Sequence, residues 1–308
     1  RLSKSYGLGI QPTNMKVNVV AVIGAGTMGA GIAQICAQRG WRTKIFDTSE
    51  KSLQTSLKSI NSFWEKGILR GKTTREQLIS WSENLETHTD MAKAVSNADI
   101  VIEAVPEILS LKKEIFSKLD NILPEKTILV TNTSSLSISE IANSTNRPDR
   151  VIGMHFFNPV PIMKLIEIVR HEKCSKETIK IAECVGLELN KKTILVHDYP
   201  GFATSRLGVI LGNEAIKMLS EGVASASDID TAMVLGYKHP IGPLELTDLV
   251  GLDVRRDILN NLANSFSDDS YLPHPLLEKL VENGNLGIKT NKGIYNWNNG
   301  VKQDRDDL

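Results

Sequence analysis

The sequence predicts an α/β protein in which a doubly wound sheet is followed by an all-helical C-terminal domain. The first observation behind this prediction is a regular alternation of strand-like and helix-like segments between residues 17 and 197. The second is a glycine-rich turn, GAGTMG at 24–29, placed between the first strand and the first helix. The third is a change of texture after Gly201, where helix-length amphipathic segments replace the strands.

The N-terminal half begins with a continuous β-branched run, VNVVAVI at 17–23. Such a run is expected for a strand that is buried on both faces of a parallel sheet. The same reasoning predicts further strands at 44–47, 99–105, 127–132, 150–157 and 165–169, and helices at 30–39, 50–67, 74–82, 108–121 and 137–143. A further helix–strand unit covers 176–197. We therefore expect a Rossmann-type domain.

The turn-rich segment HDYPG at 197–201 marks the predicted domain boundary. We expect the N-terminal domain to cover 15–199 and the helical domain to cover 200–308. Residues 1–14 carry no periodicity and directly precede Met15. We interpret them as a disordered leader or an expression remnant.

The C-terminal half offers several amphipathic helices and one short candidate strand near 294–295. In the segment SASDIDTAM we expect a helix start, with Ser227 as the N-cap and Asp230 at position N3. Apolar faces on several helices indicate packing against the first domain or against a second subunit. We therefore expect a homodimer.

Composition excludes several classes of protein. The 36 basic and 36 acidic side chains cancel, which argues against a nucleic-acid-binding surface. The odd count of 3 cysteines argues against a disulfide framework, and neither cysteines nor histidines show a metal-ligand spacing. No run reaches the roughly 18 to 20 apolar residues of a membrane span. We expect a cytoplasmic protein without a metal.

The glycine-rich turn predicts a dinucleotide site. Gly24 permits the tight turn, Gly26 lets the backbone approach a pyrophosphate, and Gly29 allows close packing of helix on strand. Asp47 ends the next predicted strand, where a carboxylate accepts hydrogen bonds from a ribose diol and repels a 2′-phosphate. These elements favour NAD over NADP, although the nearby Arg42 could accept a phosphate. The alternative is a glycine turn without a ligand.

A second candidate site rests on two residues that lie 12 positions apart, His155 and Glu167. Glu167 stands inside the apolar run LIEIV, where a buried carboxylate needs a partner. If Glu167 returns on an element next to His155, it can hold one imidazole nitrogen and stabilise the imidazolium. The alternative is a solvent-facing Glu167 and a histidine that only donates to a backbone carbonyl.

Five segments carry a resemblance to a known family: GAGTMGAGIAQ, TNTSSLSISEIA, HFFNPVPIMKLIEIV, YPGFATSRL and HPIGPLELTDLVGLDV. Together they resemble the L-3-hydroxyacyl-CoA dehydrogenase family, including its short-chain 3-hydroxybutyryl-CoA members. The resemblance runs from about Val17 to Trp297 in the right order, so it covers nearly the whole chain.

The resemblance implies roles for individual residues. His155 and Glu167 match the family's catalytic pair, Ser134 matches the serine that bonds the substrate's 3-oxygen, and Asn158 matches a substrate-positioning asparagine. The residues that match cofactor contacts are Gly24, Gly26, Thr27, Met28, Gly29, Asp47, Glu107, Lys112 and Lys289.

One residue departs from the family pattern. Ser205 in PGFATSRL stands where the family commonly has an asparagine that reaches toward the active site. We therefore expect Ser205 to be a substrate-binding position with altered contacts. The family also binds the CoA nucleotide with basic residues on the helix pair after Asp47, where Lys66, Arg70 and Lys72 lie without a secure match.

The predicted activity is reversible, NAD-dependent hydride transfer between an L-3-hydroxyacyl-CoA and a 3-ketoacyl-CoA, with an acyl-CoA thioester as substrate. Fatty acid β-oxidation and butanoate metabolism are the corresponding processes. Two alternatives stay open: a dehydrogenase of a free hydroxy or sugar acid, similar to gulonate dehydrogenase, and a non-catalytic NAD-binding protein.

Overall fold

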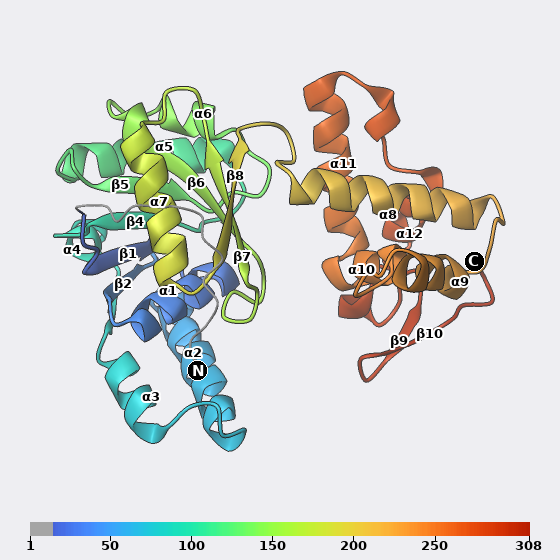
Figure 1. The fold of residues 1–308 in the computed structure, drawn as a ribbon, viewed down its shortest axis with the longest axis horizontal. Coiled ribbons are helices and arrows are strands. Elements are labelled where there is room, and N and C mark those ends of the chain that lie inside the picture. Colours follow the sequence, from blue (N-terminus) through green and yellow to red (C-terminus); the bar gives the residue numbers. More distant parts are fainter. Residues whose placement is uncertain (1–14) are drawn as a thin grey trace. The chain divides into compact units, whose positions relative to one another are not determined.

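The computed structural model describes residues 15–308 of the chain (Figure 1). The predicted leader at 1–14 lies outside these described residues. The chain divides into two compact units, which meet in sequence between Asp198 and Tyr199. Unit 1 ends at Asp198, and unit 2 spans Tyr199–Leu308. Among residues 15–308, no helix combines the length and apolarity that crossing a bilayer requires.

Unit 1 is built on one eight-stranded sheet with the order β3-β2-β1-β4-β5-β6-β7-β8. The strands are β1 (Val19–Ile23), β2 (Arg42–Phe46), β3 (Leu85–His88), β4 (Ile100–Glu103), β5 (Ile128–Thr131), β6 (Val151–Phe156), β7 (Leu165–Arg170) and β8 (Lys192–His197). All neighbouring strands run parallel except β6 and β7, which pair antiparallel. The predicted Rossmann-type sheet is confirmed.

The helices of unit 1 cover both faces of this sheet. They are α1 (Thr27–Arg39), α2 (Glu50–Leu69), α3 (Arg75–Ser82), α4 (Met91–Val95), α5 (Leu109–Ile122), α6 (Ile138–Ala142) and α7 (Lys176–Glu188), with a 3₁₀ turn at Pro148–Arg150. Alternate residues of β1 explain the two layers, because Val20 and Val22 pack with α1, α2 and α7, whereas Ala21 and Ile23 pack with α4, α5 and α6.

Two elements of unit 1, β3 and α4, were not predicted. All four residues of β3 (LETH) are only partly buried, and the strand forms one edge of the sheet beside β2. Its mixture of polar and apolar side chains therefore lacks the alternation of a half-buried strand. The remaining predicted strands and helices of unit 1 agree with the structure to within three residues at their ends.

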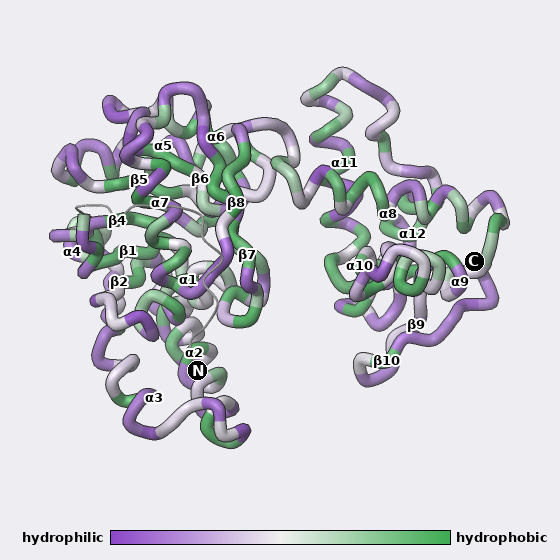
Figure 2. The backbone as a smooth tube through the Cα atoms, viewed as in Figure 1, coloured by the Kyte–Doolittle hydropathy of each residue, from purple (hydrophilic) through white to green (hydrophobic). Residues whose placement is uncertain are grey.

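Unit 2 is predominantly helical, as predicted. Its helices are α8 (Thr204–Ser220), α9 (Ala226–Thr231), α10 (Pro243–Val250), α11 (Leu252–Phe266) and α12 (Pro275–Glu282), with a π-helical turn at Ala232–Gly236 and 3₁₀ turns at Asp269–Tyr271 and Ile288–Thr290. The short strand expected near 294–295 begins later. It is β9 (Asn296–Asn298), which pairs antiparallel with β10 (Val301–Gln303). Green apolar stretches alternate with purple polar ones along α8, as an amphipathic helix requires (Figure 2).

The predicted start of α9 needs correction. The N-cap is Ser225, whose hydroxyl accepts a hydrogen bond from the Asp228 N–H, and not Ser227. Asp230 is 2% exposed and accepts hydrogen bonds from the backbone N–H groups of Leu244 and Glu245 at the start of α10. The local sequence offers two serines before acidic residues, and tertiary packing selects the first.

One nearly buried ion pair joins the end of α5 to the loop after α6 in unit 1. Arg147 Nε lies 2.6 Å from Asp120 Oδ1, and the guanidinium also donates to the carbonyl oxygens of Asp120 and Leu123. Burial alone would raise the pKa of Asp120, but hydrogen bonds from Asn146 and Arg147 outweigh it and hold that pKa below its usual range. The ionised pair therefore stabilises the folded chain above the ordinary carboxyl pKa, and this stability is lost as the pH falls through the lowered value.

We predict that Asp120→Ala destabilises the protein by about 3–5 kcal/mol at pH 7, because it leaves the buried Arg147 charge without its anion. The difference from the wild type should shrink as the pH falls below the ordinary carboxyl pKa of about 4 and through the lowered pKa of folded Asp120, because the carboxylate is then protonated. Urea unfolding at a series of pH values measures both quantities. Asp257→Ala, which removes the exposed partner of Arg256, is the control and should cost less than about 1 kcal/mol. A pH-independent difference for Asp120→Ala would contradict this account.

Candidate functional site

The glycine-rich turn leaves the N-terminus of α1 open to an anion. Gly24 follows β1 with φ +104°, a left-handed conformation that glycine adopts without strain. Gly26 is the N-cap of α1, no side chain caps the helix, and no acidic residue lies in its first turn. The backbone N–H groups of the first turn, which includes Thr27 and Met28, therefore point at a site suited to phosphate.

Gly29 is required for the packing of α1 against the turn. A Cβ atom at Gly29 would lie 1.8 Å from the carbonyl oxygen of Gly24, whereas a Cβ atom at Gly26 would meet nothing within 4 Å. Gly29 is therefore needed for the packing of the folded chain. Gly26 instead keeps open the space through which a ligand can approach the backbone.

Asp47 lies directly after β2, beside the glycine-rich turn. Its Oδ2 accepts a hydrogen bond from the Ala25 N–H at 2.9 Å, and its Oδ1 accepts one from the Ser49 N–H at 2.9 Å. Each carboxylate oxygen keeps a second lone pair for a further donor. The two bonds fix the carboxylate next to the turn, in the position expected for an acceptor of ribose hydroxyls.

His155 and Glu167 face each other across the antiparallel strands β6 and β7. The two residues are register partners, and His155 Nδ1 lies 2.7 Å from Glu167 Oε2. Glu167 is 0% exposed and His155 is 6% exposed. The structure therefore places Glu167 beside His155 and not at a solvent-facing edge. The ring of Phe157 packs against the imidazole, with the ring centroids 4.5 Å apart.

The loop between β6 and β7, which carries Asn158, is held by a residue that the sequence analysis missed. Lys191 is 7% exposed, and its Nζ donates to the carbonyl oxygens of Val160 and Met163 at 2.6 Å each. Burial lowers the pKa of Lys191. A single lysine thus fixes the connection between the strands of His155 and Glu167, a role that only tertiary structure reveals.

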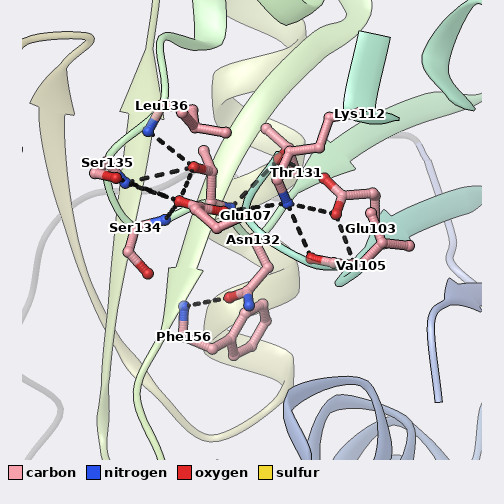
Figure 3. Close-up of polar contacts among 11 residues, drawn as sticks. Glu103, Val105, Glu107, Lys112, Thr131, Asn132, Ser134, Ser135, Leu136 and Phe156 are labelled. Carbon is pink, nitrogen blue, oxygen red and sulfur yellow. Dashed lines mark hydrogen bonds and ion pairs between the residues drawn. The ribbon is translucent and has the colours of Figure 1, made fainter. Parts of the chain in front are cut away.

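Ser134 lies in a loop after β5 that is organised by Glu107 (Figure 3). One carboxylate oxygen of Glu107 accepts hydrogen bonds from the Thr133 hydroxyl and from the backbone N–H groups of Ser134 and Ser135. The Ser134 side chain itself is partly exposed and points away from this cluster (Figure 3). Glu107 therefore fixes the backbone of the loop and leaves the Ser134 hydroxyl available to a ligand.

Lys112 forms ion pairs with two carboxylates, the exposed Glu107 and the fully buried Glu103. Its Nζ lies 2.6 Å from Glu103 Oε1 and 3.3 Å from Glu107 Oε2. Glu103 is 0% exposed and also accepts a hydrogen bond from the Thr131 hydroxyl. The sequence contained a signal for Glu103, because it is a carboxylate inside the apolar run DIVIEAV, the same kind of signal that singled out Glu167.

The described polar groups of unit 1 converge because the parallel strands β1, β4 and β5 end at one edge of the sheet. Ile23 pairs with Glu103, and Glu103 pairs with Thr131. Asn132, just after β5, accepts a hydrogen bond from the Phe156 N–H at the end of β6. The glycine-rich turn, the Glu107 network and the His155 strand thus border the same edge, where open α/β sheets bind their ligands.

Two predicted site residues, Ser205 and Lys289, belong to unit 2. Ser205 is partly buried in the first turn of α8. Lys289 Nζ lies 2.5 Å from Asp253 Oδ1 at the start of α11. The basic residues Lys66, Arg70 and Lys72 lie exposed in the last turn of α2 and the segment just after it, and within residues 15–308 none of them forms an ion pair. In the same range no group of three or more His, Cys, Asp or Glu side chains could hold a metal ion.

Comparison with known families decides the assignment. Residues 19–199 match the family described as "3-hydroxyacyl-CoA dehydrogenase, NAD binding domain", and residues 201–297 match "3-hydroxyacyl-CoA dehydrogenase, C-terminal domain". The chain belongs to the 3-hydroxyacyl-CoA dehydrogenase family. It is therefore an NAD-dependent oxidoreductase, and the predicted family and cofactor are confirmed.

Individual relatives in the dehydrogenase family are about 40% identical to this chain over the aligned residues. The 3-hydroxybutyryl-CoA dehydrogenase of Clostridioides difficile is 42% identical over 91% of this chain and 99% of its own. The 3-hydroxyadipyl-CoA dehydrogenase of Escherichia coli is 39% identical over 92% of this chain and 60% of its own. The crystal structure of (S)-3-hydroxybutyryl-CoA dehydrogenase from Ralstonia eutropha superposes with a TM-score of 0.88 at 39% identity, and covers 92% of this chain and 100% of that one.

The residues of this dehydrogenase fit NAD. The uncapped N-terminus of α1 suits the pyrophosphate, and the absence of a side chain at Gly26 leaves room for its approach. Asp47 lies beside the turn, where its carboxylate would accept hydrogen bonds from ribose hydroxyls and repel a 2′-phosphate. The cofactor contacts of Gly24, Gly26, Gly29 and Asp47 stay predictions that this geometry fits.

The two glycines of the turn should respond differently to the same substitution. We predict that Gly26→Ala keeps the melting temperature of the wild type but weakens NADH binding at least 10-fold, because the methyl group occupies the path of the pyrophosphate. Gly29→Ala should instead destabilise the fold by about 1–3 kcal/mol, because its Cβ overlaps the Gly24 carbonyl. Thermal unfolding and fluorescence titration with NADH distinguish the two effects. Equal losses of stability in both variants would contradict this division of roles.

Proposed function

We propose that the protein interconverts a short-chain L-3-hydroxyacyl-CoA, of which 3-hydroxybutyryl-CoA is the reference, and the corresponding 3-ketoacyl-CoA. The observation that carries this proposal is the contact of 2.7 Å between His155 Nδ1 and Glu167 Oε2 on paired strands. Support also comes from the relatives, two of which are 3-hydroxybutyryl-CoA dehydrogenases. In this reaction NAD⁺ would accept the hydride in the oxidising direction, and NADH would donate it in the reducing direction.

His155 acts as the general base in the oxidising direction. An alcohol gives up hydride readily only as its hydroxyl proton leaves, so a base within reach of that proton lowers the barrier. Because Nδ1 faces Glu167, Nε2 is the nitrogen that exchanges the proton with the substrate. In the reducing direction the same nitrogen returns the proton to the 3-oxygen.

Glu167 fixes the imidazole of His155 and stabilises its charged form. Its carboxylate is 0% exposed, so the attraction between the two groups is weakly screened by water. The positive charge that His155 gains on accepting a proton is thereby compensated. The arrangement corresponds to the part that the carboxylate plays in a Ser-His-Asp triad.

Three further side chains hold the substrate in this proposal. The Ser134 hydroxyl bonds the 3-oxygen, Asn158 positions the thioester side, and Ser205 contributes from unit 2. A short and aligned path for the hydride is worth several powers of ten in rate. Glu107 and Lys112 keep the Ser134 loop in place, and Lys289 contacts the cofactor.

The proposed function is tested by the oxidation of NADH, followed at 340 nm, with acetoacetyl-CoA as substrate. The same assay is repeated with free acetoacetate and with NADPH. We expect turnover with the thioester and NADH, and at least 10-fold lower kcat/KM with NADPH, because Asp47 repels the 2′-phosphate. Turnover of a free hydroxy or keto acid alone would indicate the sugar-acid alternative. NADH binding without turnover of either would indicate a non-catalytic protein.

If His155 and Glu167 act as an acid–base pair, two glutamate-to-glutamine variants should differ in turnover. Glu167→Gln should lower turnover by about 100-fold or more, because general acid–base catalysis contributes about 10² to 10⁴-fold. NADH affinity, measured by titration, should stay unchanged. Glu172→Gln replaces an exposed carboxylate just after the same strand and should keep the wild-type rate. A wild-type rate for Glu167→Gln would show that the pair is not catalytic.

We also propose that the protein is a homodimer. Support comes from large apolar side chains on the surface of unit 2, including Leu207 at 72%, Leu235 at 75% and Tyr237 at 76% exposed. Such exposed apolar side chains are typical of an association surface. Sedimentation equilibrium should give twice the chain mass of 33.9 kDa, and a mass of one chain at all concentrations would refute the proposal.

A further inference from the structure

The loop that carries Ser134, residues 132–137 between β5 and α6, is held at both of its ends by carboxylates from distant parts of unit 1. These residues form neither helix nor strand, so contacts from outside the loop decide its conformation. At the end next to β5, Glu107 accepts hydrogen bonds from three consecutive residues that begin with Thr133. At the end next to α6, the carboxylate is that of Asp198.

The Asp198 carboxylate accepts three hydrogen bonds where the loop enters α6. Its Oδ2 accepts one from the Ser137 hydroxyl at 3.0 Å and one from the Ser139 N–H at 2.7 Å. Its Oδ1 accepts one from the Ile138 N–H at 3.0 Å. The two N–H groups belong to the first turn of α6 and have no partner within the helix, and an ionised acceptor binds them more strongly than a neutral one. Asp198 therefore fixes this end of the loop.

The backbone of Asp198 is fixed in turn by the strand that carries Glu167. Its N–H donates to the carbonyl oxygen of Arg170, the last residue of β7, at 2.8 Å. Asp198 directly follows β8, whose end lies near α6 (Figure 1). A single residue thus connects β7 with the Ser134 loop, and all of these contacts lie within unit 1.

The loop also approaches the strand of His155. Ile138 is 0% exposed, and a Cβ atom at Gly153 of β6 would lie 2.9 Å from the Ile138 Cδ1 atom. The absence of a side chain at Gly153 therefore lets the start of α6 pack directly on β6. Gly153 stands two residues before His155, and residues at this spacing share one face of a strand. The end of the loop that Asp198 holds thus packs on the face of β6 to which His155 belongs.

We propose that Asp198 is a positioning residue, which fixes the place of the Ser134 hydroxyl relative to His155 by holding the far end of the Ser134 loop. The proposal rests on the proposed function, in which Ser134 bonds the 3-oxygen of the substrate and His155 exchanges its proton. Ser134 precedes Ser137 by only three residues. A segment this short, anchored at both ends, has few conformations, and releasing one end adds to them. A misplacement of about 1 Å in an active site can cost about 100-fold in rate.

The test measures kcat and KM for acetoacetyl-CoA with NADH. Asp198→Ala should lower kcat by about 10- to 100-fold, because the Ser134 hydroxyl is no longer held where the transition state requires it. The affinity for NADH, measured by titration, should stay unchanged. Asp198→Asn keeps one oxygen acceptor and should give an intermediate kcat. If Asp198→Ala does not fold, Asp198→Asn takes its place in each comparison.

Asp99→Ala is the matched control. Asp99 is a partly buried aspartate of unit 1, as Asp198 is, and its Oδ2 accepts hydrogen bonds from the backbone N–H groups of Asn18 and Val19 at 2.8 and 3.0 Å. It directly precedes β4, at the edge of the sheet opposite the strand ends that border the site. Its replacement should lower the melting temperature and keep the wild-type kcat. A kcat that falls with the melting temperature in both variants would mean that Asp198 contributes stability alone, and would overturn the proposal.

A double-mutant cycle with Ser134→Ala separates positioning from any other effect on turnover. Once Ser134 is replaced by alanine, Asp198 has no hydroxyl left to position. The double variant should therefore have the kcat of Ser134→Ala to within about 2-fold. If Asp198→Ala lowers kcat by the same factor in both backgrounds, the two residues act independently and the positioning role is refuted.

The remaining outcomes are also distinguishable. If the wild type reduces acetoacetyl-CoA and Asp198→Ala does so at the wild-type kcat, the positioning role is refuted and the proposed dehydrogenase activity stands. If the wild type binds NADH but does not reduce the thioester, the proposed function fails and the role of Asp198 fails with it.

Discussion

The burial of one carboxylate, Glu167, governs the arrangement of the site. A carboxylate that is 0% exposed at the centre of an apolar strand requires a partner, or it must take up a proton. The antiparallel pairing of β6 and β7 supplies His155 as the register partner, at 2.7 Å. A shift of the register by one residue would turn His155 to the other face and leave the carboxylate unpaired. The pair therefore constrains the sheet as much as the sheet positions the pair.

The surrounding polar groups hold this register and the neighbouring loops in place. Lys191 fixes the connection between β6 and β7 through two carbonyl oxygens. The buried pair of Glu103 and Lys112, together with the exposed Glu107, orders the loop that carries Ser134, as the dashed contacts of Figure 3 show. Every one of these buried charges is compensated, so the site is rigid before a ligand arrives.

Local sequence signals were sufficient for most of the fold. The β-branched run at 17–23, the turn at 24–29 and the following helix are defined by residues within a few positions of one another, and they were predicted correctly. The strand β3 and the N-cap Ser225 were not, because edge position and tertiary packing decide them. The contact between His155 and Glu167 could be suspected from a charge in an apolar run but not located, since separation in sequence does not give separation in space. Lys191 carried no local signal, because its carbonyl partners at Val160 and Met163 come close to it only on folding.

We propose that Glu167 orients His155 so that Nδ1 carries the proton and Nε2 serves the substrate. Long-range ¹H–¹⁵N correlation NMR of the uniformly labelled protein reports which imidazole nitrogen is protonated, and the spectrum of His155→Gln assigns the signal. With the imidazole neutral, the account predicts a protonated Nδ1 and an unprotonated Nε2 for His155, and loss of this preference in Glu167→Gln. A neutral His155 that carries its proton on Nε2 in the wild type would contradict the account.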